Sequence, residues 1–297
     1  MREYDRAHDR VARARNCSAT QTTINPPSGA IAIPGKGSRS VRSSSSNPAG
    51  IITGAATGIG AAAALALARL GARMILAAIG TEGIDPLVRS IEKHGGQAIS
   101  FACDVRDPSQ VEALSELALT SFGRIDFLVA SAGIALQDRV DSGDVTLWRD
   151  VVETNLLGLA YSVRFVLPQM YRQQSGHIFL IASQSGRQAY QGEAIYIASK
   201  WGVVGFGHAL RMEAQSSGVK VTIVEPGLVD TPLTRDNPKV RPLLDAFTPL
   251  QAEDVAAAIA YAFSQPPHVN VNELALRPLG QGEDPFRDGV RASRRTR

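Results

Sequence analysis

The chain has 297 residues, 44% of them hydrophobic and 20% charged, so it can bury a large core and fits a globular α/β protein. It contains no apolar run of about 18 residues, which argues against a membrane-spanning helix. Its two cysteines and five histidines lack the spacing of a disulfide framework or a metal site. We therefore expect no metal, no membrane partner and a reducing, cytoplasmic location.

The net charge of +3 is unevenly distributed along the chain. Residues 1–48 hold eight basic and three acidic residues, and residues 285–297 hold five basic and one acidic, which leaves a net charge of −6 between them. Nucleic-acid binding requires a basic surface on the folded part of a protein, so we expect no nucleic-acid partner. The basic ends fit solvated tails.

Residues 1–48 are rich in Arg, Ser, Pro and Gly and lack apolar periodicity, which predicts a disordered basic extension. A targeting or binding segment is the alternative. The acidic residues Glu3, Asp5 and Asp9 argue against an organelle transit peptide, and the lack of an apolar stretch near Met1 argues against a secretory signal.

From Gly50 onward, short apolar runs alternate with longer helical patterns. The expected strands are residues 51–53, 73–78, 98–102, 125–130, 177–182 and 219–224, with 273–276 as a candidate edge strand. The expected helices are residues 59–70, 83–94, 108–122, 144–174 and 195–217. This alternation predicts one doubly wound, Rossmann-type α/β domain over residues 49–284, with a parallel sheet and helices on both faces.

A glycine-rich turn follows the first expected strand, and its glycines are Gly54, Gly58 and Gly60. A turn of this kind brings backbone N–H groups close to a pyrophosphate, and the start of the next helix favours the negative charge. Many helices begin after glycine. The position of this turn, between an apolar strand and an alanine-rich helix, is the context that a dinucleotide site requires.

Tyr196 and Lys200 are four residues apart in an expected helix and therefore share one face. An ammonium group beside a phenol lowers the pKa of the phenol, which makes it a proton donor and acceptor for carbonyl and alcohol chemistry. The alternative is an ordinary pair on a solvated helix. Ser183, thirteen residues before Tyr196, and the glycine-rich turn favour the catalytic interpretation.

The motif Thr-Gly-x-x-x-Gly-x-Gly at residues 53–60, together with Ser183, Tyr196 and Lys200, resembles the short-chain dehydrogenase/reductase family over about residues 50–280. Cys103-Asp104-Val105 resembles the family's adenine-binding segment. Ser131-Ala132-Gly133 matches its Asn-Ala-Gly motif, except that serine replaces asparagine. Pro226-Gly227 with Thr231 resembles the segment that closes over the nicotinamide. The implied cofactor contacts are Gly54, Thr57, Gly58, Ile59, Gly60, Asp104, Val105, Ala132, Gly133, Tyr196, Lys200, Pro226, Gly227 and Thr231.

The resemblance also implies a catalytic group of Asn155, Ser183, Tyr196 and Lys200. Tyr196 would exchange a proton with the substrate oxygen, and Ser183 would donate a hydrogen bond to that oxygen. Lys200 would lower the pKa of Tyr196 and bind the nicotinamide ribose, and Asn155 would hold a water that relays protons to Lys200. Taken singly, Ser183 could instead be a helix cap, and Asn155 could bond a helix backbone.

The expected function is hydride transfer between NAD or NADP and a carbonyl/alcohol substrate that contacts Ser183 and Tyr196. The alternative is a non-catalytic dinucleotide sensor. In a Rossmann-type site an acidic residue at the end of the second strand selects NAD, but here Ala78 stands at that place, followed by Ile79 and Thr81. Without the carboxylate, and with a Thr81 hydroxyl as a donor, the sequence favours NADP slightly.

Other parts of the chain carry weaker expectations. Gln184, Gln188 and Gly192 are candidate walls of a substrate site. Residues 228–247 have the length and proline content of a mobile lid, whose Arg235, Lys239 and Arg241 either meet an anionic substrate or face solvent. The resemblance implies a homodimer or homotetramer, with the long helices near 144–174 and 195–217 between subunits.

Overall fold

The computed structural model describes residues 47–282. The expected extension at residues 1–48 and the tail at 285–297 therefore lie outside the described residues, apart from Asn47 and Pro48. Those two residues contact the main domain, because the carbonyl oxygens of Asn47 and Pro48 accept hydrogen bonds from Arg73.

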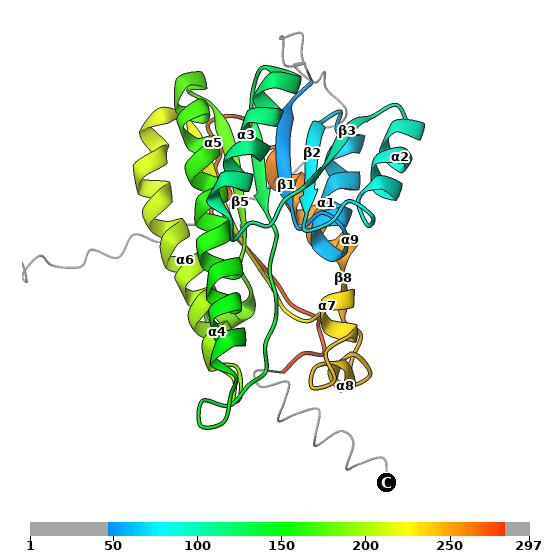
Figure 1. Ribbon diagram of the computed structural model, residues 1–297, viewed down its shortest axis with the longest axis vertical. Coiled ribbons are helices and arrows are strands. Elements are labelled where there is room, and N and C mark those ends of the chain that lie inside the picture. The colour runs from blue at the N-terminus through cyan, green and yellow to red at the C-terminus, as the bar shows by residue number, and fades with distance from the viewer. Residues whose placement is uncertain (1–46, 283–297) are drawn as a thin grey trace, which may run out of the picture. The chain divides into compact units, whose positions relative to one another are not determined.

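A seven-stranded parallel sheet forms the centre of the domain, in the order β3-β2-β1-β4-β5-β6-β9 (Figure 1). Its strands are β1 (Ala49–Thr53), β2 (Arg73–Ala78), β3 (Gln97–Ala102), β4 (Phe127–Ala130), β5 (Gly176–Ile181), β6 (Val219–Pro226) and β9 (Glu273–Leu276). The predicted parallel sheet is confirmed, including its late edge strand, which pairs with β6.

Helices cover both faces of the sheet, because successive strand residues point to opposite sides. Residues such as Ile51 and Ile75 pack under α3 (Pro108–Phe122), α5 (Leu159–Gln173) and α6 (Ala194–Ala214). Their neighbours Ile52 and Leu76 pack under α1 (Gly58–Arg69), α2 (Asp85–Lys93) and α9 (Ala252–Phe263). The two helix groups lie on either side of the sheet in Figure 1, which confirms the doubly wound arrangement.

Three local features differ from the sequence-based expectation. The single helix expected at 144–174 is α4 (Val145–Val152), a π-helix (Glu153–Gly158) and α5. Helix α9 was not expected, although a local signal was present: Gln251 and Asp254 form a capping box at its start. The proposed lid contains β7 (Val229–Asp230) and the one-turn helices α7 (Pro232–Arg235) and α8 (Arg241–Leu244). Strand β7 pairs with β8 (Leu250–Gln251), which follows the lid.

The strand order reverses between β1 and β4, which are neighbours in the sheet although β2 and β3 lie between them in sequence. Thr53 at the end of β1 aligns with Ala130 at the end of β4, and Ala130 aligns with Leu180 of β5. Ligands of open parallel sheets bind in the crevice at such a switch point. The residues that follow these three strands are the ones that the motifs single out.

Candidate active site

A cavity of about 750 Å³ lies at the carboxyl ends of the strands, within the usual range of about 300–1,000 Å³ for ligand pockets. The glycine turn and the ends of β2 and β3 line one part of it, and Ser183, Tyr196, Lys200 and residues 226–234 line the other. All but one of the implied cofactor contacts line this cavity; the exception is Gly60.

The glycine turn has the backbone that its sequence predicts. Gly54 and Gly58 have φ angles of 65° and 57°, in the left-handed region where a side chain is strained. A Cβ on Gly54 would lie 2.7 Å from the Ala132 backbone, and one on Gly60 would lie 2.2 Å from the Gly54 carbonyl oxygen. Gly60 is therefore buried beneath the turn and shapes it rather than lining the cavity. This bare backbone at the start of α1 is a cradle that suits a pyrophosphate.

The second strand ends beside a carboxylate that no sequence motif marks. Ala78, Ile79 and Gly80 line the cavity, as does Glu82, but Thr81 does not. A Cβ on Gly80 would lie 2.3 Å from the Glu82 Oε2 atom, so this carboxylate folds back against the end of β2. Arg106 and Lys200 are the only basic residues among those described that line the cavity.

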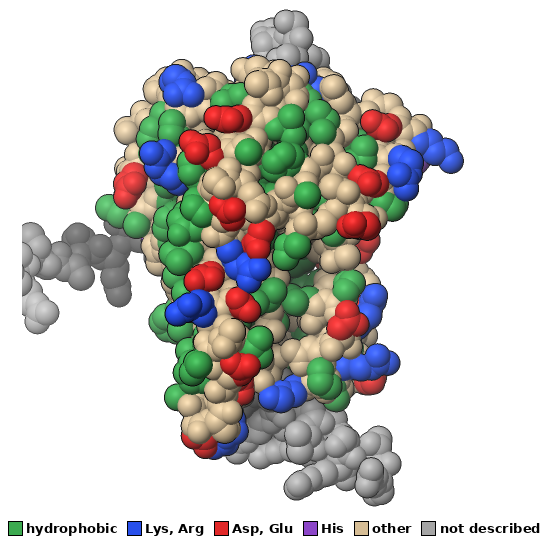
Figure 2. All heavy atoms as spheres, viewed as in Figure 1, with side chains coloured by type: hydrophobic (Ala, Val, Ile, Leu, Met, Phe, Trp, Pro, Cys, Tyr) green, Lys and Arg blue, Asp and Glu red, His purple; other side chains and the backbone are tan. Residues whose placement is uncertain are grey.

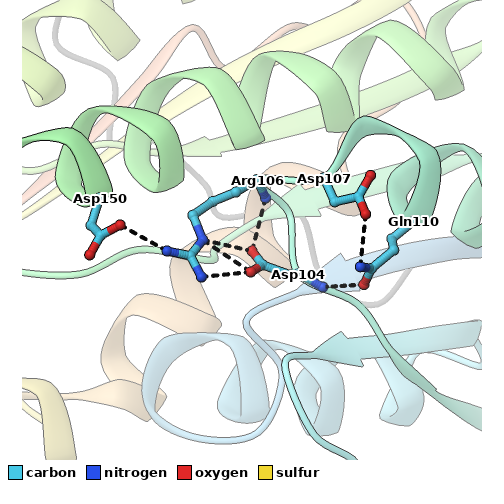
Figure 3. Close-up of polar contacts among 5 residues, drawn as sticks. All are labelled: Asp104, Arg106, Asp107, Gln110 and Asp150. Atoms are coloured by element: carbon cyan, nitrogen blue, oxygen red, sulfur yellow. Dashed lines mark hydrogen bonds and ion pairs between the residues drawn. The ribbon is translucent and has the colours of Figure 1, made fainter.

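Asp104, the implied adenine contact, is held by an arginine two residues later (Figure 3). The Arg106 Nε and Nη2 atoms donate to the Asp104 carboxylate at 3.0 and 2.7 Å, and Nη1 donates to Asp150 of α4 at 2.9 Å. The hydrogen bonds from Arg106 hold the pKa of Asp104 below its usual value. The Asp104 carboxylate therefore stays ionised and fixed at the cavity wall.

The segment Ser131-Ala132-Gly133, in which serine replaces asparagine, is held by a residue at the end of β1. The buried hydroxyl of Thr53 accepts hydrogen bonds from the backbone N–H groups of Ser131 and Ala132, at 3.2 and 3.3 Å. A Cβ on Gly133 would lie 3.2 Å from the Asn155 Oδ1 atom and 3.7 Å from the Lys200 Nζ atom. The segment therefore passes close to both of these groups.

Asn155 is fully buried in the π-helix and does not line the cavity. Its Oδ1 atom accepts from the Ile134 N–H at 2.8 Å, and its Nδ2 atom donates to the Ile134 carbonyl at 2.9 Å and to the Ser199 hydroxyl at 3.1 Å. Each side-chain atom of Asn155 thus bonds a protein group. The side chain joins the loop after β4 to helix α6, which keeps that loop beside Lys200.

Ser183, Tyr196 and Lys200 meet at the cavity wall. Ser183 ends the segment after β5 and caps a short 3₁₀ helix (Gln184–Gly186), since its Oγ atom accepts from the Ser185 N–H at 3.1 Å. Its hydroxyl also lies close enough to the Tyr196 phenol to favour the ionised form of that phenol. The Lys200 Nζ atom lies 5.8 Å from the centre of the Tyr196 ring and donates to the Ile181 carbonyl at 3.0 Å.

The expected lowering of the Tyr196 pKa by Lys200 is wrong for this arrangement. Burial raises the pKa of the Tyr196 phenol to about 12, with a further contribution from the Glu193 carboxylate, although the Ser183 hydrogen bond opposes the change. Burial also lowers the pKa of the Lys200 ammonium to about 8. Low-dielectric surroundings disfavour both charged forms, and the sequence spacing does not reveal this burial. Tyr196 therefore retains its proton at neutral pH.

A second cavity, of about 100 Å³, opens beside Ser183 and Tyr196. Gln184 lines it, as predicted for a substrate wall, but Gln188 and Gly192 do not. Sequence reasoning missed other lining residues, among them the polar Gln137, Glu193 and Gln281. Glu193 comes three residues before Tyr196, so its place in the sequence could have drawn attention to it. No local signal marks Gln137 or Gln281.

Two basic residues of the proposed lid, Arg235 and Lys239, form hydrogen bonds within the protein. The Arg235 Nε atom donates to the Asp230 carboxylate at 2.6 Å, and the Lys239 ammonium donates to the carbonyl oxygen of Gln137. Asn237, between α7 and α8, donates from its side chain to the Gln137 Oε1 atom. Leu228, Val240 and Leu243 form a small apolar cluster beneath these helices.

Comparison with known proteins places this geometry in a family. A sequence profile described as short chain dehydrogenase matches residues 49–241. The chain belongs to the short-chain dehydrogenase family. An uncharacterised oxidoreductase of Staphylococcus saprophyticus is 37% identical over 230 residues, which cover 77% of this chain and 96% of that protein.

Solved structures of the family superpose on the chain. The closed form of serine dehydrogenase complexed with NADP⁺ is 30% identical, with a TM-score of 0.74 over 79% of this chain and 96% of that one. The alcohol dehydrogenase of the archaeon Thermococcus sibiricus, complexed with 5-hydroxy-NADP, is 26% identical, with a TM-score of 0.73 over 80% and 99%. The chain is accordingly an NAD(P)-dependent oxidoreductase of carbonyl/alcohol substrates, and no finding favours a non-catalytic sensor.

Within residues 47–282, none of the helices is both long and apolar enough to cross a membrane. In the same range, His, Cys, Asp and Glu side chains form no group of three or more that could hold a metal ion.

Proposed function

We propose that residues 49–284 form a catalytic domain in which Ser183, Tyr196 and Lys200 act directly on the substrate oxygen and the cofactor. The observation that carries this proposal is that all three side chains line the larger cavity, while Ser183 and Tyr196 also line the smaller one. The cofactor, when bound, supplies or accepts the hydride. Tyr196 donates a proton to the carbonyl oxygen, and Ser183 stabilises the charge that develops there. Asn155 acts as a positioning residue for the loop beside Lys200.

The protonated state of Tyr196 bears on the direction of reaction. A phenol with a pKa of about 12 is a proton donor at neutral pH, which suits carbonyl reduction. Oxidation of an alcohol requires Tyr196 to accept a proton, and positive charge brought near the phenol, from Lys200 or from an oxidised nicotinamide ring, favours this.

Replacement Tyr196→Phe tests the assignment. We expect turnover of carbonyl substrates to fall by at least about 1,000-fold, because the proton donor is lost, while the fluorescence titration with NADPH or NADH is unchanged. Tyr261→Phe, at an exposed position on α9, is the matched control and should retain full turnover. Unaltered turnover in Tyr196→Phe would show that the phenol is not the proton donor.

We propose that the cofactor preference for NADP is slight. The absence of a carboxylate at Ala78 supports NADP, as does the NADP named in the two solved relatives above. The Glu82 carboxylate at the end of β2 opposes a 2′-phosphate by charge repulsion. We expect Glu82→Gln to tighten NADPH binding by about tenfold and to leave NADH binding nearly unchanged, since only NADPH carries the phosphate. Equal effects on both cofactors in a fluorescence titration would remove Glu82 from this role.

The remaining proposals concern the surroundings of the enzyme. We propose a homodimer or homotetramer that covers the face formed by α4, the π-helix and α6, where Leu147, Leu157 and Trp201 are 44%, 40% and 53% exposed. Figure 2 shows hydrophobic side chains along the side of the molecule where these helices lie in Figure 1. A monomeric mass in solution scattering would refute this oligomeric state.

A cytoplasmic location remains our expectation, which fractionation of cells would test.

A further inference from the structure

The smaller cavity adjoins the reaction site. It shares Ser183, Tyr196 and Gly227 with the larger cavity, and Leu228, Val240 and Leu243 of the lid segment line its other side. Its volume of about 100 Å³ has room for only a few non-hydrogen atoms. Because the two cavities share Ser183 and Tyr196, this space lies next to the position that we propose for the substrate oxygen.

Two buried amide atoms at this cavity have no hydrogen-bond partner. They are the Gln184 Oε1 atom and the Gln281 Nε2 atom, on residues that are 8% and 9% exposed. A buried polar atom without a partner costs about 1–3 kcal/mol, so such atoms are rare and require an explanation. Within the described part of the chain only two other side chains, Arg73 and His177, have such an atom, and neither lines the cavity.

The side-chain amides of Gln184 and Gln281 both lie next to Gly227. A Cβ built on Gly227 would lie 2.5 Å from the Gln281 Oε1 atom and 3.2 Å from the Gln184 Oε1 atom. The Gln281 Oε1 atom accepts from the Leu228 N–H at 3.0 Å. This bond fixes the orientation of the amide and leaves its Nε2 atom as the free donor. One free donor and one free acceptor thus lie near the nicotinamide-facing segment Pro226-Gly227.

Glu193 adds a buried carboxyl group to the same cavity. It is 4% exposed, and its oxygens accept from the Gln137 Nε2 atom at 2.7 Å and, more weakly, from the Ser185 hydroxyl at 3.4 Å. Burial raises the pKa of Glu193. A carboxyl group here repels an anionic substituent, and it leaves lone pairs for a donor. The cavity therefore suits a neutral group that donates and accepts hydrogen bonds.

A hydroxyl is the smallest substituent that meets these demands, because it donates one hydrogen bond and accepts two. We propose that Gln184, Gln281 and Glu193 form a subsite for a second hydroxyl group of the substrate. The substrate is then a small neutral hydroxyketone or hydroxyaldehyde in one direction, and the corresponding diol in the other. This inference rests on the proposed function and narrows its substrate class.

The reaction on such a substrate is balanced by the cofactor and one proton. The carbonyl carbon gains a hydride from the reduced nicotinamide, and the carbonyl oxygen gains the Tyr196 proton, so C=O becomes CH–OH while the nicotinamide is oxidised. The second hydroxyl takes no part in the redox step. It is held at the subsite and so places the carbonyl carbon.

Two ketones of nearly equal size test the subsite. Hydroxyacetone carries a hydroxyl group at the position where butanone carries a methyl group. Each ketone is assayed with NADPH and with NADH. We expect kcat/KM for hydroxyacetone to exceed that for butanone by at least about 100-fold, because the polar atoms stay unpaired with butanone. Gln184→Met and, separately, Gln281→Met should reduce this ratio to below about tenfold by lowering the hydroxyacetone value alone. Gln97→Met, at an exposed position in β3, is the control and should retain the wild-type ratio.

A second readout does not depend on turnover. Ligand-observed NMR measures the binding of 1,2-propanediol and of 2-butanol to the Tyr196→Phe enzyme with oxidised cofactor. We expect only the diol to bind. The double variant Tyr196→Phe/Gln184→Met should lose this binding. Equal kcat/KM for the two ketones would overturn the subsite and leave the oxidoreductase assignment intact. Selective diol binding without turnover of any ketone would support the subsite and overturn the proposed function. Neither turnover nor selective binding would overturn both.

Discussion

The two ends of the active-site cavity are built in different ways. At the nucleotide end the wall is largely backbone, formed by the glycine turn, and its shape depends on the absence of side chains. At the substrate end, beside the apolar residues of the lid segment, the wall carries polar side chains from four separate segments: Gln137, Gln184, Glu193 and Gln281. Backbone N–H groups recognise a phosphate that many enzymes share, whereas side chains can differ from one enzyme to the next. The first end therefore reveals the family, and the second the substrate.

Lys200, which lies where the two ends meet, should show the largest effect. We expect Lys200→Met to reduce turnover by about 1,000-fold, since the ammonium serves Tyr196 and the cofactor, and yet to stabilise the fold at pH 7 by about 1 kcal/mol, since a buried charge is removed. The Lys200 pKa is lowered to about 8 in the folded protein, whereas an unperturbed lysine has a pKa of about 10.4. Between these two pH values the unfolded chain therefore binds more protons than the folded protein does.

This difference in bound protons sets the sign of the pH dependence. Stability of the wild-type protein should rise with pH across that window, and the Lys200→Met variant should lack this rise. Chemical denaturation at pH 7, 8, 9 and 10 measures both quantities. A variant that is less stable than wild type at pH 7 would show that the bond from Lys200 to the Ile181 carbonyl outweighs the cost of burying the charge.

Replacing Gly60 breaks the nucleotide end alone. A Cβ at Gly60 would come within 2.2 Å of the Gly54 carbonyl oxygen, and the turn must then move. We expect Gly60→Ala to weaken cofactor binding by about 100-fold, or about 3 kcal/mol. Gly205→Ala, in α6 with open space around its Cβ position, should leave cofactor binding unchanged. If both variants bound the cofactor equally well in a fluorescence titration, the shape of the turn would not matter for binding.

The sequence predicts the glycine turn of the nucleotide end well because the signals for that turn are local. The glycine spacing, the strand before it and the helix after it fall within about twenty consecutive residues, as does the pair Tyr196 and Lys200. The strand and helix alternation likewise predicts all seven strands of the sheet, with boundaries that shift by at most two residues.

The rest depends on contacts between distant residues, which a single sequence does not reveal. Arg106 and Asp150 are 44 residues apart, Leu228 and Gln281 are 53 apart, and Gln137 and Asn237 are 100 apart. The Tyr196 pKa was mispredicted for a related reason. The charge partner can be read from the spacing, but the burial that decides the direction of the shift arises from the whole fold.

The smallest predicted effect concerns how the substrate end is held together. The Asn237 side chain donates to the Gln137 Oε1 atom, and the Gln137 Nε2 atom donates to Glu193. This chain of bonds links the segment between α7 and α8 to the start of α6. Asn237→Ala removes one neutral hydrogen bond, which is worth about 0.5–1.5 kcal/mol.

We expect KM for the ketone substrate to rise by up to about tenfold in Asn237→Ala, with little change in kcat, because Gln137 then orients Glu193 less firmly. Cofactor affinity should not change, since the bond lies outside the nucleotide end. Asn272→Ala, at an exposed position just before β9, is the matched control and should leave KM at the wild-type value. A fall in kcat and in cofactor affinity together would mean that the two ends are not independent, and that the lid segment bears on the nucleotide as well as on the substrate.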